Sequence, residues 1–98
     1  MSALMLTARR PTYGTGKKTA YTGTAGSTTV PADTNTVIIC CSTDAYVRVG
    51  ATATTADLFL PKGVIAQIPV DNKTGAPITV SAIQDADGGN MFCIGASE

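Results

Sequence analysis

The sequence predicts an all-β protein, an antiparallel β-sandwich or jelly-roll-like fold that follows an extended N-terminal arm. Short β-branched runs recur from residue 28 onward, each bounded by Gly, Pro, Asp or Asn, which is the spacing typical of a sandwich or barrel. No window holds an i, i+3, i+4, i+7 apolar pattern longer than about two helical turns. Residues 12–29 are mostly Thr, Gly, Ser and Ala, a composition typical of an extended linker or a weak edge strand. We therefore expect an arm at residues 1–27 and a β body at residues 28–98.

The body is expected to contain seven short strands. Apolar residues alternate within 64–70 and 78–83, as they do in half-buried strands. Residues 37–41, in contrast, are apolar at every position, so we expect a central strand that is packed on both faces. Residues 52–57 form one helical turn at most. The expected strands are 28–30, 36–42, 45–49, 57–60, 64–70, 78–83 and 90–94.

Turn residues separate these strands. Pro61-Lys62-Gly63 suits a type I or II turn, because Pro fixes φ and Gly can take a positive φ. Residues 71–75 and 85–90 are polar hairpin loops. Proline cannot donate to a β-ladder, so Pro31 and Pro69 indicate edge strands or bulges. In a chain of 98 residues, this pattern fits one compact antiparallel sandwich or jelly roll.

The net charge of zero is divided unevenly along the chain. Residues 1–32 hold four basic residues and no acidic residue, whereas residues 33–98 hold three basic and seven acidic residues, so the two parts are +4 and −4. This asymmetry indicates either a solvated N-terminus or an arm that docks on an acidic surface or a nucleic acid. A short apolar tip precedes the charges and could anchor the arm. We expect the partner-binding residues of the arm to be Leu4, Met5, Leu6, Arg9, Arg10, Tyr13, Lys17, Lys18 and Tyr21.

Basic and aromatic residues alternate in this arm, as they do in proteins that bind single-stranded nucleic acid. The acidic body would repel the same polymer, so we favour a protein partner and expect no nucleic acid. The apolar tip is too short for a signal peptide, and its basic residues follow it instead of preceding it. No apolar run is long enough to span a membrane. Assembly in the cytoplasm is therefore expected.

The residue types argue against catalysis, a metal site and a cofactor. The chain has no His and one Glu, and no paired carboxylates stand at a useful spacing. Cys40, Cys41 and Cys93 lack a CxxC spacing and a His partner, so we expect buried, unreactive thiols. Residues 14–19 end like a phosphate-binding loop but lack its first glycine. Residues 85–89 begin like a calcium loop but lack its later ligands, so we expect a plain hairpin, with a weak cation site as the alternative.

Three segments give the sequence a family resemblance. They are AYVRVG at residues 45–50, ATTADLFLPKGV at residues 53–64, and IQD followed by GNMF within residues 83–92. Together they resemble a group of small structural proteins of tailed bacteriophages. The resemblance covers roughly residues 28–95, and the arm and the Cys40-Cys41 pair depart from the group's pattern.

The resemblance implies a non-enzymatic role in the virion, as a β-sandwich or jelly-roll module in a symmetric homo-oligomer. We expect a capsid decoration or cement protein, a trimer assembled in the host cytoplasm, that binds the major capsid protein and stabilises the shell through its arm. The alternative is a tail or head–tail adaptor that docks fibres or other tail proteins. A nucleic-acid-binding β-barrel is the third possibility. An arm of 27 residues can extend to roughly 90 Å, far enough to cross a subunit boundary and add a strand to a neighbour.

Overall fold

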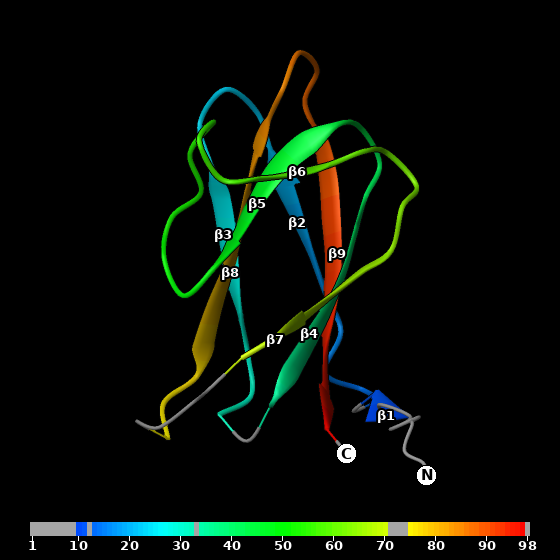
Figure 1. Cartoon of the computed structure of the whole chain (residues 1–98), viewed down its shortest axis with the longest axis vertical. Coiled ribbons are helices and arrows are strands. Elements are labelled where there is room, and N and C mark those ends of the chain that lie inside the picture. Colours follow the sequence, from blue (N-terminus) through cyan, green and yellow to red (C-terminus); the bar gives the residue numbers. More distant parts are fainter. Residues whose placement is uncertain (1–9, 12, 33, 71–74, 98) are drawn as a thin grey trace, which may run out of the picture.

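The structure is a computed structural model, and it describes residues 10–11, 13–32, 34–70 and 75–97. Within these ranges the chain forms strands joined by turns, without a helix (Figure 1). The strands are β1 (Arg10–Pro11), β2 (Lys17–Tyr21), β3 (Gly26–Val30), β4 (Thr36–Cys41), β5 (Ala45–Val49), β6 (Leu58–Leu60), β7 (Ala66–Pro69), β8 (Ile78–Gln84) and β9 (Gly89–Ser97). Each of the seven strands expected in the body is present, with ends that differ by a few residues.

Two antiparallel sheets pack against each other, which confirms the predicted all-β sandwich. In the first sheet, β9 is paired with β4 on one side and with β2 and then β1 on the other, and β7 forms the far edge beside β4. The second sheet has the order β3-β8-β5-β6. We call them sheet A and sheet B. Pro31 and Pro69 follow or end the edge strands β3 and β7, as their missing N–H groups predict.

The strand pairing is nested along the chain. β2 pairs with β9, β3 with β8, β4 with β7, and β5 with β6, and all four pairs are antiparallel. Successive pairs belong alternately to sheet A and sheet B. The strands of the first half of the chain therefore pair antiparallel with those of the second half, and the paired strands surround a single core.

The core lies between the two sheets and is built from alternate residues of the central strands. β4 and β9 contribute inward side chains from sheet A, and β5 and β8 do so from sheet B. Removing such side chains from water contributes about 1.5–3 kcal/mol each. The buried cluster consists of Tyr21, Val30, Val37, Ile39, Cys41, Ala45, Val47, Leu60, Val80, Ala82, Met91 and Cys93.

The expected extended arm does not reach residue 27. β2 pairs with β9 and β3 pairs with β8, so residues 17–27 belong to the sandwich and not to an extended arm. The alternative expectation of weak edge strands is the correct one for these residues. β2 and β3 each bury one apolar residue in the core, Tyr21 and Val30, and β9 and β8 supply the backbone partners of these two strands. At the corner between them, a Cβ on Gly26 would collide with the carbonyl oxygen of Ala20, so only glycine fits.

Candidate interaction surface

The outer face of sheet A is apolar at its centre. Ile38 and Cys40 point outward from β4, because Val37, Ile39 and Cys41 on the same strand are buried inward. Phe92 and Ile94 point outward from β9, between the buried Met91 and Cys93. The register places Ile38 opposite Ile94 and Cys40 opposite Phe92, so the four side chains lie side by side.

These side chains border a shallow hollow of about 400 Å³. Ile65, which precedes β7, extends the apolar surface and is 66% exposed, and Phe92 is 44% exposed. Lys18 on β2 is paired with Phe92, and its Nζ lies 6.0 Å from the centre of the ring. None of the described residues that line the hollow is acidic. We call this surface face A, formed by Lys18, Ile38, Cys40, Ile65, Phe92 and Ile94.

The sequence expectation for residues 37–41 is therefore met on one side only. Their inward side chains pack in the core, but the described part of the chain leaves the outward ones open. The outer face of an antiparallel sheet normally carries polar residues. The apolar run at residues 37–41 is therefore the feature of the sequence that indicates face A.

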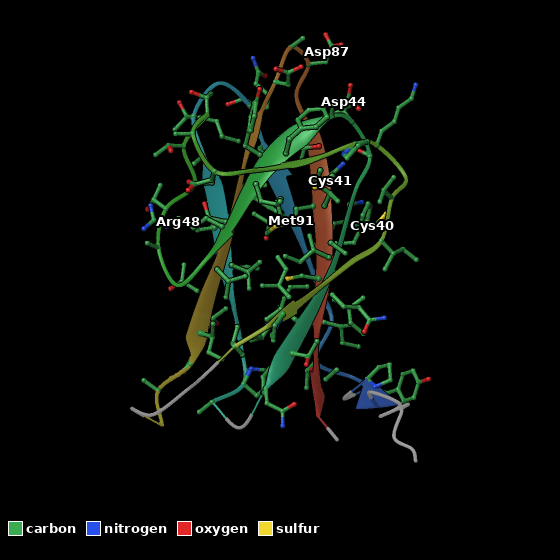
Figure 2. All side chains as sticks on the ribbon, in the orientation of Figure 1. Cys40, Cys41, Asp44, Arg48, Asp87 and Met91 are labelled. Atoms are coloured by element: carbon green, nitrogen blue, oxygen red, sulfur yellow. The ribbon has the colours of Figure 1, made fainter. Side chains whose placement is uncertain are left out.

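The three thiols differ in their surroundings; Cys40 and Cys41 are labelled in Figure 2. Cys41 and Cys93 are buried, and burial raises the pKa of each to about 11. Cys40 is half-buried and borders the hollow of face A. The expectation of buried, inert thiols holds for Cys41 and Cys93, whereas Cys40 is the thiol that a partner or reagent on face A would meet.

A second exposed apolar group lies on the outer side of sheet B. Tyr46 on β5 is paired with Phe59 on β6 and Ile83 on β8, and Tyr46 lies between the buried Ala45 and Val47. The rings of Tyr46 and Phe59 lie 5.5 Å apart, and Phe59 is 45% exposed. The Tyr46 hydroxyl donates to Asp85 Oδ1 at 3.1 Å, and this hydrogen bond raises the pKa of Tyr46. We call this surface face B, formed by Tyr46, Phe59, Ile83 and Asp85.

Acidic residues surround face B, and a loop covers the rest of sheet B. Asp44 and Asp87 are exposed and lie at the same end of the sandwich as Asp85 (Figure 2). The loop after β5 crosses the middle of the sheet, where the N–H of Ala53 donates to the buried Ser81 Oγ at 2.9 Å. Face B is thus the part of this outer surface that the loop leaves open.

A groove of about 620 Å³ opens between the sheets, where β5 and β8 face β7. Its walls include the partly buried Val49, Ile68, Val70 and Ile78, which pack against the core. Arg48 and Asp57 stand at its border with an N–O distance of 3.8 Å. Such an exposed ion pair contributes at most about 1 kcal/mol. The groove is an extension of the core to the surface.

The structure separates the residues predicted to bind a partner through the arm. Lys18 is exposed on β2 and belongs to face A. Lys17 is also exposed, but its pairing with Cys93 places it on the other side of sheet A. Tyr13 is 84% exposed in the turn before β2. Tyr21 is 2% exposed, and its hydroxyl bonds to Thr43, so it is a core residue and not an arm residue. Arg10 lies in β1, where it pairs with Ser97. The remaining candidates lie outside the described residues: Leu4, Met5, Leu6 and Arg9.

Comparison of the chain with protein-family models, curated proteins and solved structures gave no match. Among the described residues, no group of three or more His, Cys, Asp or Glu side chains is arranged to hold a metal ion. The described residues also contain no helix long and apolar enough to cross a membrane. Faces A and B and the charges beside them are the surface features that can recognise a partner.

Proposed function

We propose that the protein is a structural component of a bacteriophage virion, a decoration or cement protein that acts by docking and not by catalysis. The observation that supports this best is face A, an apolar sheet surface that the described chain leaves open. Contiguous exposed apolar patches mark interaction sites in soluble proteins, because leaving them in water is unfavourable. A small domain buries only about 60% of its unfolded surface, so a partner on face A would also stabilise it.

We also propose that the sandwich is a jelly roll. The support is the nested pairing of β2 with β9, β3 with β8, β4 with β7 and β5 with β6, in alternate sheets. Jelly rolls of eight strands are common in viral capsid domains. A fold alone does not determine a function. The jelly-roll topology therefore supports the proposed virion role only together with face A and the resemblance of residues 28–95 to phage structural proteins.

In this proposal the partners are the major capsid protein and further copies of the chain, with a trimer as the expected oligomer. The β body would form the oligomer, and residues 1–16 would contact the shell. The basic residues Arg9 and Arg10 suit an acidic shell surface, and the apolar Leu4, Met5 and Leu6 suit a hydrophobic contact beside it. No cofactor takes part.

Deletion of residues 1–9 tests the arm, because it leaves every described strand in place. Deletion through residue 26 is unsuitable, since it removes β2 and the buried Tyr21. We expect the shorter deletion to lower occupancy on purified particles at least tenfold, with an unchanged circular dichroism spectrum and melting temperature. Full occupancy by the deleted protein would show that the arm does not bind the shell.

Copy number distinguishes the proposed role from the alternative. Quantitative mass spectrometry of purified particles should find hundreds of copies of a decoration protein. Six or twelve copies would instead favour the tail or head–tail adaptor, and absence from the particle would contradict both. Binding of the isolated protein to single-stranded DNA that weakens steeply with salt would favour a nucleic-acid-binding domain instead.

A further inference from the structure

We propose that face A is covered by face B of a second copy of this chain, so that copies associate head to tail. The inference rests on the proposed structural role and identifies the partner of its main surface. Face A lies on the outer side of sheet A, and face B lies on the outer side of sheet B. The two surfaces therefore point away from each other within one copy and can meet only between copies.

The apolar parts of the two faces offer a hollow on one side and an exposed aromatic ring on the other. Face A has a hollow of about 400 Å³ among Ile38, Cys40, Phe92 and Ile94. On face B the ring of Phe59 is 45% exposed and tilted by 58° against the ring of Tyr46. An exposed aromatic side chain that enters an apolar hollow is the usual centre of a protein interface. Phe59 is the side chain that we place in the hollow.

The charges favour contact between face A and face B over contact between like faces. Face A carries Lys18, and face B carries Asp85 with Asp44 and Asp87 beside it. Lys62, whose N–H donates to Asp44 Oδ1 at 2.9 Å, also lies next to Asp44, so the acidic residues near face B outnumber the basic one. Two copies of face A would bring lysines together without a lining carboxylate among the described residues, and two copies of face B would bring carboxylates together. Opposed charges at the rim of an interface select the partner and its orientation.

The resulting contact is heterologous, because each copy uses two different surfaces. A pair joined in this way still has one free face A and one free face B. Further copies therefore add until a ring closes, or a filament grows if the rotation between copies does not close. A closed ring agrees with the symmetric oligomer expected of a decoration protein.

Complementation between two variants tests the contact directly. Phe92→Ser disables face A, and Phe59→Ser disables face B; both side chains are exposed, so the fold should remain. Tyr13→Ser is the matched control, since Tyr13 is an exposed aromatic residue outside both faces. Sedimentation velocity on the full chain should show oligomers for the parent and for Tyr13→Ser, and monomers for each face variant. An equimolar mixture of the two face variants should form dimers only.

The outcomes separate this inference from the proposed function. A parent chain that stays monomeric at several hundred micromolar, or a mixture that does not dimerise, would overturn the contact. If the monomeric parent still binds particles and Phe92→Ser abolishes that binding, face A binds the shell protein. In that case only the proposed contact between copies is wrong. If the oligomer forms as described but does not bind particles, the inference holds and the proposed function fails.

Cross-linking provides a second readout that does not depend on affinity. Cys40 is the thiol that borders face A, while Cys41 and Cys93 are buried. In the variant Phe59→Cys, mild oxidation should produce disulfide-linked oligomers through Cys40 of one copy and the new thiol of the next. The control variant Thr55→Cys, which places the new thiol on the exposed loop, should form no disulfide-linked oligomers. Adding Cys40→Ser to the Phe59→Cys variant should abolish its disulfide-linked oligomers. Equal yields of disulfide-linked oligomers from Phe59→Cys and Thr55→Cys would contradict the proposed contact.

Discussion

Tyr21 is the residue that packs the otherwise polar strand β2 onto the core of the sandwich. Its ring is buried, and its hydroxyl donates to the carbonyl oxygen of Thr43 at 3.0 Å and accepts the N–H of Thr43 at 3.2 Å. Thr43 in turn donates from Oγ1 to the carbonyl oxygen of Asp87 at 3.0 Å. This chain of hydrogen bonds joins β2 to the loops that precede β5 and β9.

Replacing Tyr21 with Phe should destabilise the protein by about 1–3 kcal/mol. The ring still fills the core, but the partly buried backbone groups of Thr43 lose a hydrogen-bond partner, which costs more than removing both partners together. For a domain of this size, each kcal/mol lowers the melting temperature by about 4–8 °C. Differential scanning calorimetry would measure the change, with Tyr13→Phe as the exposed control. Equal melting temperatures for the two variants would mean that the Tyr21 hydroxyl does not contribute.

The buried thiols should make stability fall at high pH. Burial raises the pKa values of Cys41 and Cys93 from 9.0 to about 11, so the folded state favours the neutral thiols. Their contribution is complete below about pH 9 and is lost as the pH rises through 11, on the order of 2 kcal/mol for each thiol. Urea denaturation between pH 8 and pH 11 would measure it. Cys93→Ala should show a shallower decline, and an identical decline would exclude Cys93 as the cause.

The two sides of strand β4 have different surroundings: one packs in the core and the other forms part of face A. Ile39 is fully buried in the core, whereas Ile38 on the opposite side borders face A. Adjacent residues of one strand thus offer a matched pair with the same side chain and the same hydrogen-bonded ladder. Any difference between their variants comes from what each face contacts.

Ile39→Ala should cost about 2–5 kcal/mol of folding stability, because it leaves a cavity in the core. Ile38→Ala should cost about 1 kcal/mol or less in the monomer, since its side chain is only half-buried. The order reverses for association: the Ile38 variant should weaken self-association at least tenfold. Chemical denaturation of dilute protein and sedimentation of concentrated protein would measure the two effects. Equal losses of folding stability in both variants would place Ile38 inside a covered interface within the chain.

Strands β4 and β2 show how much of the fold can be predicted from the sequence. The alternation of buried side chains identified the body strands, because period-two burial is a local property. The apolar run at residues 37–41 also identified a central strand, but not whether the second face packs within one copy or between copies. For β2, Thr and Gly composition suggested an arm, since pairing with β9 depends on residues about 70 positions away. Face B was missed because its residues come from three separate strands.

For the whole molecule, charges of opposite sign lie beside the two apolar faces. Lys18 of β2 lies in face A, and the exposed carboxylates Asp44, Asp85 and Asp87 lie at the end that holds face B. A sandwich with one basic apolar face and one acidic apolar face repels its own copies in like orientation. It attracts them head to tail, which links the charge pattern in the sequence to the symmetry of assembly.

Head-to-tail association should make thermal stability depend on protein concentration. A ligand that binds only the folded state adds RT ln(1 + [L]/Kd), about 2.7 kcal/mol at a concentration 100 times Kd. The melting temperature of the parent chain should therefore rise as its concentration is increased a hundredfold. Phe59→Ser should show no such rise, because face B is lost. High salt should reduce the rise by screening the contacts of Lys18 with the acidic end. A parent melting temperature that is constant over this range would mean that each copy is stable alone with both faces open.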